Sequence, residues 1–214
     1  MTTTLPALPA NFAAALELID KAHAEDPRSV PGADGGGGTT VPHELDYARK
    51  MTRWLSARCP DASPTLQLAC RAQHFRRWEI PRDSFPMTRA GYLTWRAKQK
   101  AQAAERIKAL LSSSTSSSPP PLLPAEDVDR VAALVRKENL AADAETQALE
   151  DVACLVFLDD QLDDFGRRDD VDEDKMLGIL RKTWAKMSPR GRELALAMDL
   201  SERGKTLVGK ALAG

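Results

Sequence analysis

Apolar residues recur every three or four positions along most of this chain, which is the spacing of amphipathic helices. No stretch alternates strands with helices. The sequence therefore predicts an all-α fold, a single-domain helical bundle over residues 11–213 after a flexible N-terminus at 1–10. The predicted helices cover 11–24, 64–78, 88–111, 125–139, 143–165, 175–187, 189–200 and 201–212, with one more that starts at 40–44 and ends before 60–63. Thr88, Asp143 and Ser201 are predicted N-caps.

Two interruptions predict flexible loops, at 28–40 and 112–124. The first contains four consecutive glycines, but no Lys-Ser or Lys-Thr pair follows them, so the context of a phosphate-binding turn is missing. The second contains ten consecutive Ser, Thr and Pro residues, which is typical of a flexible surface insertion. A later acidic stretch, 169–174, lacks the glycine and the terminal glutamate of a calcium loop.

Three carboxylates interrupt stripes that should be buried. Glu44 heads an otherwise apolar helical stripe. Glu150 and Asp151 lie in the most apolar helix of the chain, which we expect at the centre of the bundle. Because a buried unpaired charge is costly, these carboxylates need a metal ion or an arginine.

Charge is distributed unevenly, although the formal net charge is only −1. Residues 71–100 carry eight basic and two acidic side chains, whereas residues 159–174 carry nine acidic and two basic ones. A dipolar surface or an internal pairing of the two stretches follows. The small net charge argues against a general nucleic-acid coat protein.

Cysteine usage and hydropathy indicate the compartment. The three cysteines have no CxxC spacing, so neither a disulfide framework nor a zinc ribbon is indicated. No apolar run reaches the roughly 18 residues of a membrane span. We expect a protein of the cytoplasm or nucleus that does not contact a membrane.

Imidazole and carboxylate groups on separate helices are the groups from which helical bundles build metal sites. We expect His74, Glu44 and Asp151 to bind a divalent metal (Mn, Fe, Ni, Zn or Mg), with His43 as an alternative ligand. The metal would polarise a phosphoryl group and lower the pKa of a bound water. Glu150 would act as the catalytic general base.

Phosphate binding is assigned to Arg77, Arg82 and Arg89, because the planar guanidinium group suits phosphate oxygens. The predicted function is a metal-dependent phosphohydrolase of a nucleotide or another small phosphorylated substrate. Two alternatives stay open. Internal ion pairs with Arg76 or Arg77 would neutralise the carboxylates without a metal, and residues 71–100 would then form a non-catalytic surface for RNA or a protein.

The segment Lys186-Met187-Ser188 resembles the KMSKS loop of class I aminoacyl-tRNA synthetases. Those enzymes also need a parallel nucleotide-binding sheet, which this helical pattern does not provide. Ser188 as a helix N-cap, followed by Pro189 in the first turn, explains the same residues. The chain is therefore not expected to be a synthetase.

The order His43, His74, Asp151 is similar to that of HD-domain phosphohydrolases, which are all-helical metal enzymes with a His…His-Asp…Asp order. This resemblance implies an HD-like arrangement of helices. The chain departs from the pattern at Phe75, which stands at the place of the signature aspartate and removes a bridging ligand.

A more specific resemblance extends over residues 11–212. The segments PHEL (42–45), GYL (91–93), LEDV (149–152) and KTW (182–184) are similar to those of the family called domain of unknown function 4202, whose members are often labelled glutamyl-tRNA synthetase. The family brings no settled activity. Its pattern has a Phe-His pair where this chain has Gln102-Ala103, so Ala103 would mark the loss of a ligand if that histidine binds metal elsewhere in the family.

Overall fold

The computed structural model describes residues 4–32, 39–113, 121–162 and 172–213. Its α-helices are α1 (Ala10–His23), α2 (His43–Arg58), α3 (Pro64–Arg71), α4 (Arg89–Ser112), α5 (Ala125–Arg136), α6 (Ala144–Val156), α8 (Glu173–Lys186), α9 (Pro189–Leu196) and α10 (Glu202–Ala213). The shorter elements are strands β1 (Ser29–Pro31) and β2 (Thr40–Pro42), turns η1 (Arg77–Glu79) and η2 (Arg82–Ser84), and the π-helical segment η3 (Phe157–Gln161). The predicted all-α fold is confirmed.

Several helices begin where the sequence predicts an N-cap. The side chains of Thr88, Asp143, Ser188 and Ser201 each accept a hydrogen bond from a backbone N–H of the following turn. The first N–H groups of a helix have no acceptor within the helix, so each cap supplies a hydrogen-bond acceptor that the helix itself lacks.

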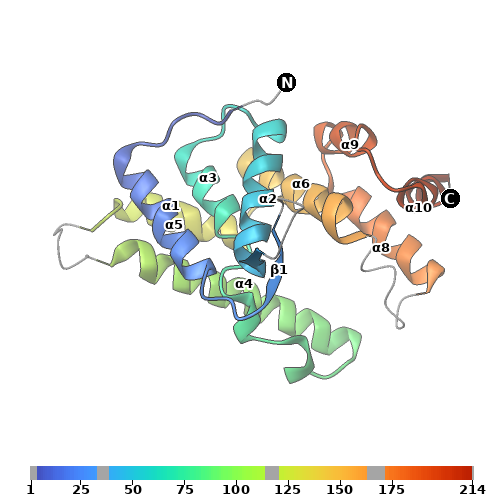
Figure 1. The fold of residues 1–214 in the computed structure, drawn as a ribbon, viewed down its shortest axis with the longest axis horizontal. Coiled ribbons are helices and arrows are strands. Elements are labelled where there is room, and N and C mark those ends of the chain that lie inside the picture. The colour runs from blue at the N-terminus through green and yellow to red at the C-terminus, as the bar shows by residue number, and fades with distance from the viewer. Residues whose placement is uncertain (1–3, 33–38, 114–120, 163–171, 214) are drawn as a thin grey trace.

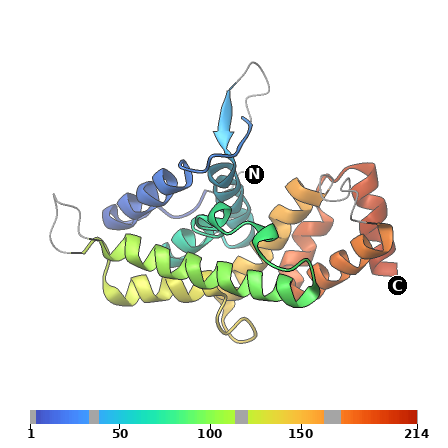
Figure 2. The same ribbon diagram turned by 90° about the horizontal axis from the view of Figure 1, so that it is seen from below.

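The first hydrophobic core lies among α1 to α6, and α2 and α6 lie side by side in the middle of the molecule (Figure 1). The α2 stripe is buried as predicted: Ala48, Met51 and Leu55 are fully inaccessible, and Glu44 at its head is 1% exposed. α4 and α5 run side by side along one edge (Figure 2).

The second core is formed by the end of α6 with α8, α9 and α10, at the other end of the molecule in Figure 1. α6 supplies both cores, because Leu149 and Val152 face the first and Leu155 faces the second. Trp54 of α2 packs against both. Among the helices of the described residues, none combines the length and the apolar composition that a membrane crossing requires.

Three local predictions are wrong. The helix predicted over 64–78 ends at Arg71, and the following loop holds His74 and Arg76 at φ of 68° and 52°, which an α-helix does not permit. The predicted loop at 28–40 includes strand β1, which pairs antiparallel with β2 at and just after the end of that loop. The helix predicted over 143–165 is α-helical only to Val156 and continues as η3. Most of the Ser/Pro insertion and half of the acidic stretch 169–174 lie outside the described residues.

Asp151 of α6 connects the two cores. Its side chain is fully buried, and its Oδ2 lies 2.6 Å from Nε of Arg58 in α2. The backbone N–H of Ser188 donates to Oδ1 at 2.8 Å, and the Ser188 hydroxyl donates to Oδ2 at 2.5 Å. Gln147 donates to Oδ1 at 3.0 Å. The carboxylate therefore holds α2 and the start of α9 against α6.

Gly191 makes this junction testable, because a Cβ at that position would lie 2.7 Å from Cγ of Asp151. We expect Gly191→Ala to lower the free energy of unfolding by about 2 kcal/mol through overpacking. The matched control is Gly178→Ala in α8, where a Cβ would meet no atom within 4 Å. That change should raise stability by about 0.5–1 kcal/mol. Urea denaturation measures both, and a destabilisation shared equally by the two variants would contradict this view of the junction.

Candidate functional site

A small pocket lies between the loop after α3, helix α4 and the end of α5. It is lined by Gln73, His74, Phe75, Arg77, Arg96, Gln99, Lys100, Ala103, Val135 and Lys137. Half of these side chains are basic or contain imidazole, and none of them is acidic. We call this site the basic pocket. Its volume is about 20 Å³, enough for roughly one water molecule.

The backbone that forms the basic pocket is strained. Among the described residues, non-glycine residues with positive φ are His74, Arg76, Lys137 and Asn139. Two of them, His74 and Lys137, line the pocket. A left-handed conformation costs a non-glycine residue on the order of 1 kcal/mol, and such residues gather at functional sites. The strained backbone and the cluster of basic side chains therefore occur at the same pocket.

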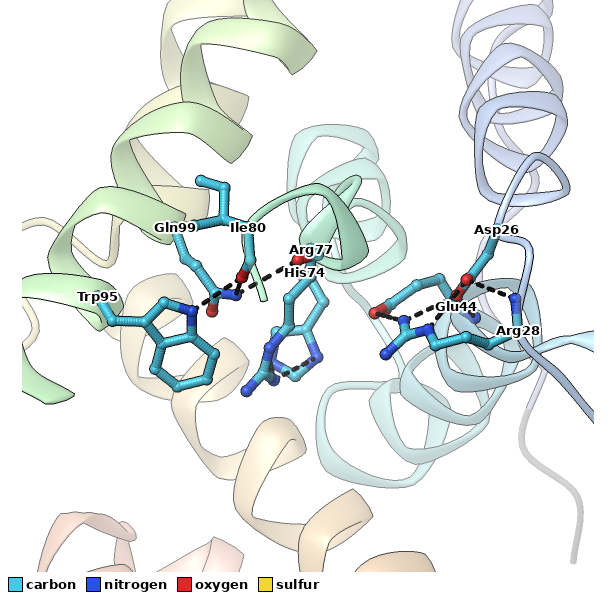
Figure 3. Close-up of polar contacts among 8 residues, drawn as sticks. All are labelled: Asp26, Arg28, Glu44, His74, Arg77, Ile80, Trp95 and Gln99. Atoms are coloured by element: carbon cyan, nitrogen blue, oxygen red, sulfur yellow. Dashed lines mark hydrogen bonds and ion pairs between the residues drawn. The ribbon is translucent and has the colours of Figure 1, made fainter. Parts of the chain in front are cut away.

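Helix α4 fixes the strained loop in position. Nε1 of Trp95 donates to the carbonyl of Ile80 at 2.9 Å, and Nε2 of Gln99 donates to the same carbonyl at 3.1 Å (Figure 3). Both donors come from the buried face of α4. Since the carbonyl of Ile80 accepts two hydrogen bonds, the chain after His74 is held against the helix that supplies half of the pocket's cations.

His74 and Arg77 form the floor of the pocket. His74 stacks on the ring of Tyr47 at 4.3 Å, and Nη1 of Arg77 lies 2.9 Å from Nε2 of His74. Burial, and then the charge of Arg77, lowers the pKa of His74 well below its usual value. The imidazole is therefore neutral at physiological pH, so Nε2 can accept from the guanidinium group.

Three cations of the pocket form no ion pair among the described residues. Among the described residues, no carboxylate lies within ion-pair distance of Arg77, Arg96 or Lys100. Burial lowers the pKa of Arg77, and Arg96 adds to the effect. Burial also lowers the pKa of Lys100, with further lowering from Lys137 and Arg96. These shifts have the direction expected of a cationic site that lacks an anion.

Lys137 is the neutralised cation of the pocket. Its Nζ lies 2.5 Å from Oε2 of Glu150, and Nζ of Lys186 lies 3.5 Å from the other oxygen. Burial raises the pKa of Glu150, but the two lysines outweigh burial and the net pKa is lowered. Glu150, the predicted general base, is thus an ionised carboxylate directly behind Lys137.

Glu44 lies in a second polar cluster beside the pocket, to the right of His74 and Arg77 in Figure 3. Nη2 of Arg28 lies 2.8 Å from Oδ2 of Asp26 and 2.9 Å from Oε1 of Glu44. Oε2 of Glu44 and Nδ1 of His43 are buried and have no hydrogen-bond partner. Burial raises the pKa of Glu44 to about 7, although Arg77 and Arg28 oppose the rise.

The structure does not bring the three predicted metal ligands together. His74 lines the basic pocket, Asp151 is occupied at the junction of the two cores, and Glu44 pairs with Arg28. Among the described residues, the only His, Cys, Asp and Glu side chains grouped closely enough to hold an ion are Asp26, His43 and Glu44, whose ligand atoms lie within 4.8 Å of one another. A metal bound by His74, Glu44 and Asp151 does not fit this arrangement.

The predicted phosphate ligands are also separated. Arg77 lines the pocket, but Arg82 and Arg89 do not. The guanidinium of Arg82 donates to the carbonyls of Phe85 at 3.0 Å and Pro86 at 2.9 Å, which closes the loop before α4. Arg89 is exposed at the first residue of α4.

The arginines of residues 71–100 do not form a continuous basic surface. Arg71 pairs with Asp20 at 2.6 Å, and Arg76 pairs with Glu25 at 2.6 Å. The alternative that Arg76 or Arg77 pairs with the α6 carboxylates is wrong, because Arg58 and Lys137 pair with them instead. The sequence contains no local signal for these partners, since each is more than ten residues from its carboxylate.

The fold and the pocket together define an all-helical protein with a basic pocket between α4 and the end of α5. Residues 13–208 match the family model described as Domain of unknown function (DUF4202), and the chain belongs to that family. Comparison with curated proteins and with solved structures gave no match. The HD-like arrangement stays a prediction. Ala103 lines the same pocket as His74.

His23 of α1 contacts the end of α3 and the loop that follows it, which lines the basic pocket. Its Nε2 lies 2.9 Å from the carbonyl oxygen of Arg71, at the end of α3, and its ring meets Phe75 edge-on at 5.4 Å. The side chain is fully buried. Burial lowers its pKa from 6.5 to about 4, although the hydrogen bond to Arg71 opposes the change.

A buried neutral histidine makes stability sensitive to acid. Between pH 6.5 and about 4 the unfolded chain binds a proton at His23 that the folded chain does not, so stability falls as the pH falls through this window. We expect His23→Gln, which keeps an N–H donor, to remove up to about 3 kcal/mol of this loss. Urea denaturation at several pH values measures the difference. Parallel pH dependence of the two proteins would contradict a neutral His23.

Proposed function

We propose that the basic pocket binds a small phosphorylated ligand. The observation that supports this is the set of Arg77, Arg96 and Lys100, which line one pocket and have no carboxylate partner among the described residues. Partly buried positive charges without a countercharge cost free energy. A phosphate group would supply that charge, and guanidinium and ammonium groups form their strongest hydrogen bonds with such anions.

The basic side chains of the pocket differ in how firmly they are held in position. Arg77 is held by Trp95 and His74, so its N–H groups form a fixed floor. Arg96 and Lys100 are partly exposed on α4, so they can move to admit an anion that is larger than the closed cavity. Lys137, which pairs with Glu150, lines the same pocket.

Two substitutions on α4 test the binding site. We expect Arg96→Ala and Lys100→Ala each to weaken the binding of inorganic phosphate by about tenfold, because each removes a charge-assisted contact. The matched control is Arg89→Ala, which removes an exposed arginine of the same helix outside the pocket. Isothermal titration calorimetry at one fixed salt concentration gives the three affinities. Equal weakening by Arg89→Ala would show that only general surface charge matters.

Metal-assisted hydrolysis of the bound ligand is the second candidate. It is favoured by Asp26, His43 and Glu44, because a buried oxygen of Glu44 and a buried nitrogen of His43 lack partners in a group whose ligand atoms lie within 4.8 Å of one another. A divalent cation held there would polarise a phosphoryl oxygen. In this candidate Glu150, which its lysines keep ionised, is the general base.

Arg28 competes with a cation for this cluster, since its guanidinium group already bridges Asp26 and Glu44. We expect Arg28→Ala to bind Mn²⁺ at least about tenfold more tightly than the unchanged chain, because it removes a competing positive charge. Manganese electron paramagnetic resonance measures the free ion, and circular dichroism checks the fold. Arg53→Ala, which removes an exposed ion pair with Asp159, is the control. Equal Mn²⁺ affinity in all three proteins would contradict this candidate.

A further inference from the structure

Exposed apolar side chains lie just before and near the start of α4, the helix that supplies Arg96 and Lys100 to the basic pocket. Met87, which precedes the helix, is 73% exposed, and Tyr92 and Leu93 of α4 are 47% and 57% exposed. Tyr92 differs from the other two in having a flat ring. Isolated apolar residues on a surface need no explanation, but an exposed aromatic ring on the helix that supplies two of the pocket's cations suits a ligand with both an apolar and an anionic part.

The spacing along α4 places Tyr92 on the same face as the pocket's cations. Tyr92, Arg96 and Lys100 are four residues apart in turn, and residues four apart on a helix are neighbours. Four residues of helix rise by about 6 Å. The ring of Tyr92 therefore lies roughly one helical turn from Arg96, which is comparable to the span between the base and the phosphate of a nucleotide.

Tyr92 is connected to the floor of the pocket through Trp95. The two ring centroids are 5.8 Å apart, and Cζ of Arg77 lies 5.0 Å from the Trp95 centroid. In Figure 3 Trp95 and Arg77 come from different elements and lie beside each other. Trp95 is therefore a shared neighbour of Tyr92 and of Arg77.

Arg82 completes the support of Tyr92. Its guanidinium carbon lies 6.0 Å from the Tyr92 centroid and 5.8 Å from the Trp95 centroid. Its N–H groups donate to backbone carbonyls, so its position is set by the loop rather than by a ligand. Tyr92 is thus backed by fixed groups and still exposes nearly half of its surface.

We infer that the ligand of the basic pocket is a nucleotide whose base stacks on Tyr92 while its phosphate binds Arg77, Arg96 and Lys100. This inference rests on the proposed phosphate binding. Aromatic stacking accepts any base, because every base has a π face. A sugar phosphate would satisfy the cations but would leave the exposed ring unused.

The experiment compares adenosine monophosphate, ribose 5-phosphate and inorganic phosphate by titration calorimetry on the full chain. Adenosine monophosphate should bind at least about tenfold more tightly than ribose 5-phosphate, and Tyr92→Ala should remove this difference. Tyr92→Phe should keep it, because the ring is retained. Leu196→Ala, which removes an exposed apolar side chain of α9, is the matched control and should change nothing.

The outcomes separate the two proposals. If phosphate and ribose 5-phosphate bind but the adenine adds no affinity, the nucleotide inference fails and phosphate binding stands. If none of the three compounds binds, phosphate binding itself fails, and the inference fails with it. If Tyr92→Ala weakens inorganic phosphate as much as adenosine monophosphate, Tyr92 supports the fold of the pocket rather than a base, and the inference is overturned.

Discussion

Two consecutive carboxylates at the centre of α6 constrain the whole structure. Glu150 and Asp151 are both buried, and consecutive residues on a helix project about 100° apart, so they need different cations on different sides. Asp151 is matched by Arg58 and by the start of α9, which joins the two hydrophobic cores. Glu150 is matched by Lys137, which places a lysine at the basic pocket. One dipeptide therefore positions both the C-terminal helices and part of the candidate site.

The basic pocket has more positive charge than the protein itself neutralises. Elsewhere a buried arginine forms an ion pair with a carboxylate, as Arg71 does with Asp20. At the pocket it does not, although the strained loop at His74 and the left-handed end of α5 at Lys137 both bring cations there. Strain and unmatched charge each lower stability, and their coincidence at one site is the pattern expected where binding rather than folding has shaped the residues.

Most of the fold could be predicted from the sequence because its signals are local. Helical periodicity and the N-caps at Thr88 and Asp143 are read within a few residues, and the helix starts that they predict are observed. The end of α3 was missed because nothing in the apolar pattern shows that His74 turns left-handed. The hairpin β1–β2 was missed because its strands are only three residues long. The candidate site was found in part. His74 and Arg77 line the pocket, whereas Arg96 and Lys100 were singled out only as members of the basic stretch 71–100, and Lys137 depends on a partner in another helix.

The segment Lys186-Met187-Ser188 resembles a catalytic motif, but its three residues have structural roles. Ser188 caps α9 and donates to Asp151, and Met187 is buried in the second core. Lys186 lies 3.5 Å from Glu150, so it contributes to the charge balance of α6. Each of the three residues is thus required by the two carboxylates of α6 or by the packing around them. The likeness to a synthetase loop is accounted for by this capping, pairing and packing, whereas the unpaired cations lie in the pocket that Lys137 lines.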